Sequence, residues 1–221
     1  MMLPSIVALL IFSYIPMAGI IIAFQKFNPG YGLFGASPWV GLDNFRYIFS
    51  LPSIWQVVGN TLILSIAKIF FGTLLAIATA LLLNECRCKF FKKSVQTVIY
   101  FPYFISWIIL AGILTDMLSP TKGIVNQLIM VFGGDPIYFL GDNKYFRGTL
   151  IVSDIWKNFG YNSVVYLAAI TGIDMSLYEA AAIDGAGRWK QTLHVTLPGI
   201  SVIIILMIIL NMGNLLNAGF D

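Results

Sequence analysis

Charged side chains are scarce in this sequence, and their scarcity argues against an ordinary soluble domain. Of the 221 residues only 10% are charged and 58% are hydrophobic, with a mean hydropathy of +0.85. An average soluble domain carries about a quarter charged residues, so a soluble core does not account for this composition. The net charge of +3 is small and its basic residues are scattered, which gives no footprint for nucleic acid.

The sequence also holds few of the side chains that metal binding and catalysis need. His194 is the single histidine, and Cys86 and Cys88 are the two cysteines. One C-x-C pair with a histidine in another loop is too small a ligand set for a metal, and a reducing cytosol would keep both thiols free. The sequence contains no G-x-x-x-x-G-K-[ST] phosphate loop and no recognisable triad or carboxylate pair. We therefore expect no enzyme activity, no ATP hydrolysis and no bound cofactor in this chain.

Long apolar runs are what the sequence has instead. A helix needs roughly 20 mostly apolar residues to cross the hydrocarbon layer, where it must satisfy its own backbone. Three runs carry no charge and two are interrupted, by Lys68 and by Asp154 with Lys157. The fold class that follows is all-α, a polytopic membrane helical bundle. Its five predicted spans are residues 1–25, 54–83, 94–115, 149–171 and 195–220.

The orientation follows from one cluster of basic residues after the second span. It contains Arg87, Lys89, Lys92 and Lys93, against the single acid Glu85. By the positive-inside rule this connection is cytoplasmic. Alternation then places residues 26–53 and 119–148 outside, and residues 172–198, which we call the inner loop, inside.

No polar block is large enough for a second folded domain, so we expect one membrane domain over residues 1–221. The chain stops at Asp221, directly after the fifth span, and we expect its C-terminal end to be incomplete. In the first outer loop, residues 28–38 are dense in Gly and Pro and should turn. Residues 39–49 should form a short interfacial helix rich in aromatic side chains.

Two features inside the spans bear on a transport path. Asp154 and Lys157 are three residues apart, so on a helix they share a face and can neutralise each other, and Lys68 is the deepest lone charge. Pro102 should kink the third span among aromatic side chains. Sugar rings stack on aromatic faces, so Tyr103, Trp107 and Tyr166 are candidates for a sugar path, although such rings also pack against lipid or neighbouring helices.

The inner loop has the pattern of two short helices joined by a turn. Ser176 and Glu179 have the S-x-x-E spacing of a capping box, which predicts a helix starting near Leu177. Three alanines then favour helix and offer little bulk, and Gly185 and Gly187 should end or bend it. A second helix is expected over residues 188–195, with Pro198 in the first turn of span five.

The tip of the inner loop is edged by the charged residues Glu179, Asp184, Arg188 and Lys190. Such a shape suits docking on a cytosolic partner, but a plain connection is also compatible with it.

The same loop carries a family motif. Glu179-Ala180-Ala181, three residues, Gly185, nine residues, Val195, one residue and Leu197-Pro198 resembles the EAA motif, E-A-A-x3-G-x9-I-x-L-P, of ABC importer permeases. Only Val195 departs from it, in place of Ile. Residues 40–45, 60–61 and 153–156 are similar to the carbohydrate-uptake branch, and residues 177–186 with 188–190 to oligosaccharide permeases of the LplB type.

The resemblance implies the fold of a type I ABC importer transmembrane domain, usually with six spans, and a multi-pass location in the plasma membrane of a Gram-positive bacterium. The partners it implies are ATP-binding ABC subunits, which use the ATP, a second homologous permease, an extracellular solute-binding protein and a sugar or oligosaccharide substrate. It implies that residues 172–198 are the coupling loop, with Glu179, Ala180, Ala181, Asp184, Gly185 and Arg188 at the ATPase subunit.

Two other functions are compatible with the residues themselves. An ion-coupled secondary transporter, or a fragment of one, would use Lys68, Asp116 and Asp154 as coupling residues. A membrane assembly protein would use the inner loop only for docking. The partner of the inner loop distinguishes them, because only an importer requires an ATPase there.

Overall fold

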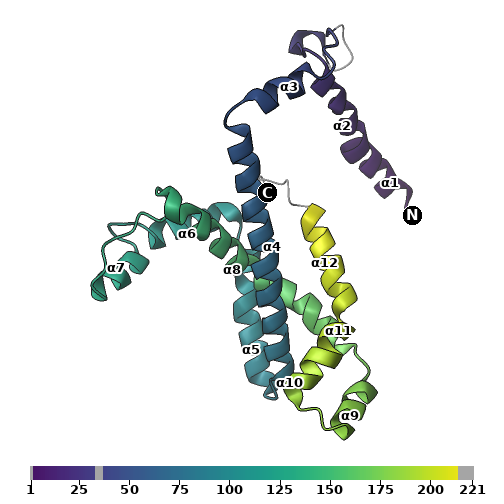
Figure 1. Cartoon of the computed structure of the whole chain (residues 1–221), viewed down its shortest axis with the longest axis vertical. Helices are drawn as coiled ribbons and strands as arrows, with labels where there is room; N and C mark the ends of the chain where they lie inside the picture. Colours follow the sequence, from purple (N-terminus) through teal and green to yellow (C-terminus); the bar gives the residue numbers. More distant parts are fainter. Residues whose placement is uncertain (1, 33–36, 214–221) are drawn as a thin grey trace. The chain divides into compact units, whose positions relative to one another are not determined.

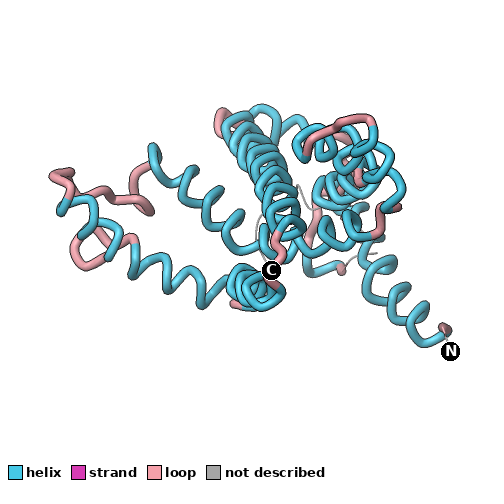
Figure 2. The backbone as a smooth tube through the Cα atoms, turned by 90° about the horizontal axis from the view of Figure 1, so that it is seen from below, coloured by secondary structure: helices cyan, strands magenta, loops and turns pink. Residues whose placement is uncertain are grey.

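The computed structural model describes residues 2–32 and 37–213. Within these ranges the chain is helical apart from loops and one isolated antiparallel bridge between Gln25 and Trp39 (Figures 1 and 2). The chain divides into two compact units, Met1–Asn60 and Thr61–Asp221. The all-α prediction is confirmed, and a single domain over residues 1–221 stays a prediction.

The first unit consists of one broken helical rod followed by a short amphipathic helix. Its elements are α1 (Leu3–Leu9), η1 (Leu10–Tyr14), α2 (Ile15–Met17), η2 (Ala18–Phe24), η3 (Pro29–Tyr31), α3 (Asp43–Ser50) and the beginning of α4 (Ile54–Glu85).

One amide side chain joins the end of the rod to α3. Asn44 Nδ2 donates to the carbonyls of Ala23 at 2.9 Å and Gln25 at 3.0 Å. Phe24 stacks on Trp39 with ring centroids 5.6 Å apart. The predicted short helix is thus present as α3, starting four residues later than expected. Part of the predicted turn, residues 33–36, lies outside the described residues.

The second unit contains the remainder of α4 and all later elements. They are α5 (Lys89–Tyr100), η4 (Phe101–Phe104), α6 (Trp107–Met117), α7 (Ile124–Val131), α8 (Asn143–Thr171), α9 (Met175–Ile183), α10 (Arg188–Gln191), η5 (Thr192–Thr196), α11 (Leu197–Gly199) and α12 (Ser201–Gly213).

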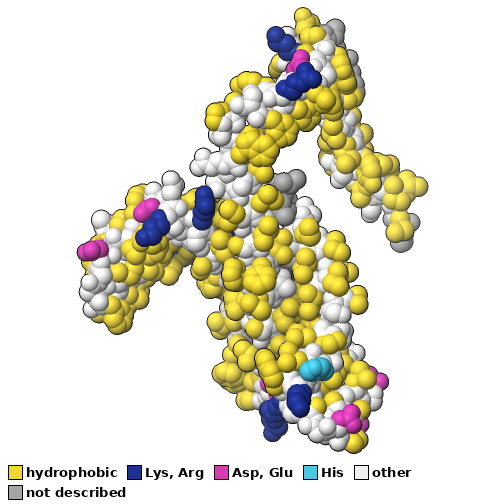
Figure 3. All heavy atoms as spheres, in the orientation of Figure 1, with side chains coloured by type: hydrophobic (Ala, Val, Ile, Leu, Met, Phe, Trp, Pro, Cys, Tyr) yellow, Lys and Arg dark blue, Asp and Glu magenta, His cyan; other side chains and the backbone are white. Residues whose placement is uncertain are grey.

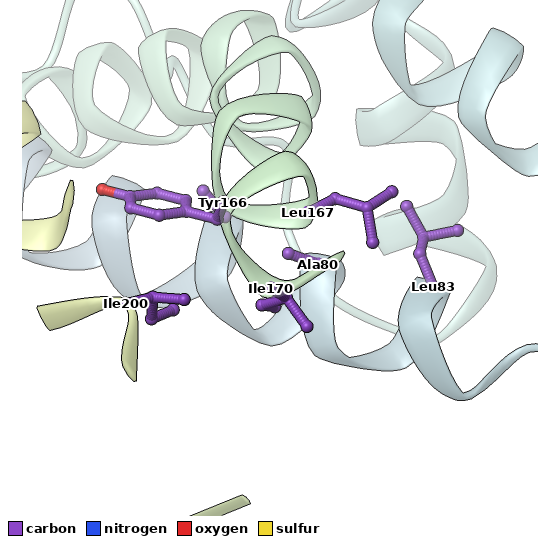
Figure 4. Close-up of a cluster of buried hydrophobic side chains, with 7 residues drawn as sticks. Ala80, Leu83, Tyr166, Leu167, Ile170 and Ile200 are labelled. Carbon is purple, nitrogen blue, oxygen red and sulfur yellow. The ribbon is translucent and has the colours of Figure 1, made fainter. Parts of the chain in front are cut away.

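Helix α8 supplies the central seam of this unit. Apart from the adjacent pair Tyr166 and Leu167, its buried residues recur every three or four positions, the spacing of one helix face. In the close-up, Tyr166, Leu167 and Ile170 of α8 lie against Ala80 and Leu83 of α4 (Figure 4). Small residues allow the close approach, and Ile200 completes the cluster. The buried positions of α8 are Ser153, Lys157, Gly160, Ser163, Tyr166, Leu167 and Ile170.

The predicted spans fall on helices, and α8 covers the fourth of them without a break, but the third and the fifth are bent. Leu3–Phe24 and Ile54–Glu85 are each long and apolar enough to cross a membrane, and counting each bent helix pair as one span gives up to five. The third span is not one helix over residues 94–115: its halves, Lys89–Phe104 and Trp107–Met117, differ by 102°. The break lies at Ile105 and Ser106, which are extended, and not at Pro102 itself. The end of the fifth predicted span, residues 214–220, lies outside the described residues.

Candidate functional site

The first helix of the inner loop is capped by a residue other than the predicted one. Helix α9 begins at Met175, and the Asp174 carboxylate accepts a hydrogen bond from the Ser176 backbone N–H at 2.9 Å. The capping-box prediction placed Ser176 at the cap and was wrong by two residues. A carboxylate satisfies the free amides and also favours the positive end of the helix dipole. The hydrogen bonds from the Ser176 backbone, and then from its side chain, lower the pKa of Asp174.

The turn after α9 forms at Gly185, where the sequence predicts it. Gly185 has φ +77°, a conformation that a side chain disfavours. Its N–H donates to the Ala182 carbonyl at 3.0 Å, and the Ala186 N–H donates to the Ala181 carbonyl at 2.8 Å. This pair of bonds is a Schellman motif, which satisfies the last carbonyls of the helix. The alanine-rich helix therefore ends in a closed and hydrogen-bonded turn.

The second helix of the inner loop begins at Arg188, as predicted, and extends through the predicted range as α10 and a π-helical segment, η5. It differs from the prediction in its length, because it does not stop at residue 195 but continues into α11 around Pro198. Span five is bent by 57° between Arg188–Gly199 and Ser201–Gly213. Helix α10 thus continues through η5 and α11 to the start of span five.

Two hydrogen bonds hold the halves of the inner loop together. Tyr178 Oη lies 3.0 Å from Thr196 Oγ1, and Gln191 Nε2 donates to the Ala186 carbonyl at 3.0 Å. These bonds join α9 to η5 and the turn to α10. The inner loop is thus a helix-turn-helix whose two halves are hydrogen-bonded to each other, and not an irregular connection.

The predicted coupling residues are presented at one end of the second unit. Glu179, Ala180, Asp184 and Gly185 are exposed and Ala181 is half-buried. Charged side chains gather at the end that carries α9 and α10, whereas apolar side chains cover α4 and α12 (Figure 3). A patch with small residues flanked by charges can accept a close-fitting partner.

Arg188 has a partner that the sequence analysis did not find. Its Nη1 lies 3.2 Å from Oε2 of Glu85, the last residue of α4. Both side chains are exposed, so the pair contributes little stability, but it marks α4 and the inner loop as neighbours (Figure 1). Because the two residues are 103 positions apart in the sequence, no local sequence pattern could predict this ion pair.

The aromatic candidates fall into two places. Tyr103 and Trp107 lie on either side of the break in the third span, and Lys157 Nζ is 5.6 Å and 5.4 Å from their ring centroids. Tyr103 also stacks on Tyr161 with centroids 4.1 Å apart. Tyr166 is only 1% exposed and belongs to the core beside α4, so the structure does not bring it to the other two.

The intramembrane charges pair differently from the prediction. Lys68 Nζ lies 3.2 Å from Asp154 Oδ1, which joins α4 to α8. Lys157 instead donates to backbone carbonyls of the third span. The prediction that Asp154 and Lys157 neutralise each other was wrong, because cross-helix partners are available on both sides of α8. Among the described residues no cluster of three His, Cys, Asp or Glu side chains is placed to hold a metal.

Comparisons with known proteins agree with this architecture. Residues 72–220 match the family of binding-protein-dependent transport system inner membrane components. The polygalacturonan/rhamnogalacturonan transport system permease protein YteP of Bacillus subtilis is 44% identical over all of this chain and 68% of its own length. The protein LplB of the same organism is 40% identical over all of this chain and 69% of its own length.

A solved structure is similar over the whole chain. A chain of the bacterial alginate ABC transporter, in complex with an alginate pentasaccharide-bound periplasmic protein, aligns with a TM-score of 0.89. The two chains are 40% identical, and the alignment covers 100% of this chain and 72% of the other.

Proposed function

This chain belongs to the family of binding-protein-dependent transport system inner membrane components, and we propose that its substrate is a sugar or oligosaccharide delivered by an extracellular binding protein. The relative YteP carries polygalacturonan and rhamnogalacturonan in its name, and the solved relative is an alginate transporter. As a permease subunit the chain is a membrane transport component. The observation that carries the proposal is the inner loop, whose exposed, closed turn continues directly into span five.

The partner of the inner loop is an ATP-binding subunit, which binds and uses the ATP. Glu179 meets a basic residue of that subunit, and Ala180 and Ala181 allow close seating. Asp184 and Arg188 flank the contact, and the Gly185 turn ends it. Their exposure and the Schellman closure support this assignment.

The complete importer contains a second homologous permease and an extracellular solute-binding protein. Residues 1–221 act as one permease domain in the plasma membrane of a Gram-positive bacterium, as expected from relatives in Bacillus subtilis. Tyr103 and Trp107 line the sugar path from this subunit; this assignment is supported by their positions on either side of the break of the third span, with both ring centroids within 5.6 Å of Lys157 Nζ. Tyr166 contributes from the core by shaping the α4–α8 contact.

An ion-coupled transporter is supported less well. Its coupling charges would include Lys68 and Asp154, but each already has an opposite charge at 3.2 Å. In the importer the same pair has a structural task, which is to hold α4 against α8.

The experiment that tests the proposal is co-purification of the full complex through a tag on this subunit, followed by uptake in proteoliposomes. Mass identification should find an ATPase with a phosphate loop and a second permease. Uptake is measured with labelled oligosaccharides of galacturonan, rhamnogalacturonan and alginate, with lactose and maltose for comparison. A complex whose ATPase lacks the phosphate-loop lysine is the control and should accumulate nothing. Recovery of this subunit alone, with uptake that survives ATP depletion, would overturn the proposal.

A further inference from the structure

The break of the third span leaves polar backbone groups inside the membrane domain. The last carbonyls of a helix have no partner within that helix, and unsatisfied backbone groups are costly where water is absent. Here η4 ends at Phe104, and a new helix begins only at Trp107. The Ile105 N–H closes the last turn of η4 on the Pro102 carbonyl at 3.2 Å, and the Ser106 side chain caps the new helix by accepting from the Ile109 N–H at 3.4 Å. Neither bond satisfies the carbonyls of Tyr103 and Ile105.

Lys157 of α8 satisfies the open end. Its Nζ donates to the carbonyls of Tyr103 at 2.9 Å and Ile105 at 2.6 Å. The residue is only 7% exposed. An ammonium group favours the negative end of a helix, and hydrogen bonds from a charged donor are stronger than neutral ones. Both bonds reach across more than 50 residues of sequence, so they fix one span against another.

Aromatic rings and a close backbone contact surround the Lys157 ammonium group. The ammonium lies within 5.6 Å of the ring centroids of Tyr103 and Trp107, a distance at which a cation is attracted to a ring face. One turn further along α8, Tyr161 stacks on Tyr103 with planes only 7° apart. Between them Gly160 touches the main chain of the third span, where an added Cβ would collide with the Ile99 carbonyl.

We propose that Lys157 is a positioning residue for transport: it clamps the break of the third span and thereby sets Tyr103 and Trp107 for sugar passage. The inference rests on the proposed function, which places both rings on the sugar path. Lys157 acts through the two rings and does not itself need to touch the sugar. A neutral side chain of similar length would bury in the same place but would leave both carbonyls open.

The first test is the kinetics of ATP-driven uptake in the reconstituted complex. The probe is a galacturonan oligosaccharide, or whichever other sugar of the panel the unmodified complex accumulates. Lys157→Met should raise KM by about tenfold or more while Vmax stays within about twofold, since two charge-assisted hydrogen bonds are lost. Lys157→Arg keeps a buried donor with several N–H groups and should restore most of the affinity. The amount of ATP-binding subunit that co-purifies with the variant should not change, because about 20 Å of α8 separates Lys157 from the inner loop.

The second test does not depend on uptake. In hydrogen exchange of the purified complex, amides of residues 105–110 should exchange about tenfold faster in Lys157→Met and not in Lys157→Arg, whereas those of α9 should be unaffected. The two tests therefore separate the inference from the proposed function. If the unmodified complex shows no ATP-driven sugar uptake, the proposed function is overturned, whereas the exchange rates still report whether Lys157 holds the break of the third span.

Three results would overturn the inference. One is unchanged exchange and KM in assembled Lys157→Met, and another is a fall in Vmax alone. If Lys157→Met does not assemble, Lys157→Gln decides, because it keeps a polar side chain in the same place but removes the cation; an unchanged KM in that variant overturns the inference.

Discussion

At the scale of single residues, Glu179 is the exposed acid of the inner loop that has the most specific proposed task. It lies on α9 next to the small side chains of Ala180 and Ala181, with no bulky neighbour in sequence on that side. An exposed carboxylate is well hydrated and inexpensive to keep. When such a carboxylate is buried against a basic residue of a partner, its removal weakens binding, because the basic residue is left buried without its opposite charge.

Glu179→Ala should reduce ATP-driven uptake and ATPase recovery by at least about tenfold, since truncating one partner of a buried charge pair leaves the other unpaired. Membrane insertion should not change, because alanine is the better helix former. Uptake and ATPase recovery are measured on the same preparations. Glu179→Gln separates the charge from the shape of the side chain and should behave like alanine. Normal uptake in both variants would remove Glu179 from the interface.

Gly185 is required for its backbone angle and not for space. A Cβ built there meets nothing within 4 Å, but φ is +77°. A residue with a side chain pays about 1–2 kcal/mol in this region, and a β-branched one more. Asparagine tolerates the same angle comparatively well.

Gly185→Val should therefore open the Schellman turn and uncouple ATP hydrolysis from sugar uptake, with hydrolysis continuing and uptake falling by about tenfold or more. Gly185→Asn is the matched control and should retain most of the coupling. The ratio of sugar transported to ATP hydrolysed measures the effect. Equal ratios in the two variants would show that the angle at this position is irrelevant to coupling.

At the scale of elements, the start of α9 depends on an acid whose protonation can be controlled. The pKa of Asp174 is lowered by hydrogen bonds from Ser176. A lowered folded-state pKa means that the cap stabilises the helix above the unfolded-state pKa. That contribution is lost as the pH falls through the still lower folded-state value. The ordinary pKa of 3.8 marks the upper edge of this window.

The first-turn amides of α9 should consequently exchange faster, relative to the middle of α8, when the pH falls below 3.8. Asp174→Asn caps without a titratable group, so it should exchange alike on both sides of the window. Asp174→Ala should exchange fast throughout. Exchange rates corrected for the intrinsic pH dependence provide the measurement, and a pH response retained in Asp174→Asn would assign the titration to another group.

The elements also show what sequence patterns can and cannot predict. Gly185 was predictable because its effect is local: the glycine lies three residues after the last of the three alanines and turns the chain at the end of their helix. The cap was harder, because Asp174 and Ser176 are both good capping residues two positions apart. Lys157 was paired with Asp154 by spacing along one helix, but its acceptors lie 52 and 54 residues away. Contacts across such separations follow from how spans pack, which periodicity does not encode.

At the scale of the whole molecule, the orientation in the membrane decides whether the inner loop can meet an ATPase. Glu85 and Arg188 are 3.2 Å apart, so the connection after α4 and the inner loop lie on the same side of the membrane. That connection contains both cysteines, with Cys88 exposed and Cys86 half-buried. The basic residues around them predict the cytoplasmic side.

A membrane-impermeant maleimide should therefore label Cys88 in inside-out vesicles and leave it unmodified in intact cells, because the reagent cannot cross the bilayer. The matched control is Thr121→Cys in a chain with Cys86→Ser and Cys88→Ser. Thr121 is exposed in the loop between α6 and α7, which the same orientation places outside, so this variant should be labelled in intact cells. Mass shift of the purified subunit measures both reactions. The opposite pattern would turn the inner loop outward, where no ATP-binding subunit could reach Glu179, and both the importer and its coupling site would have to be abandoned.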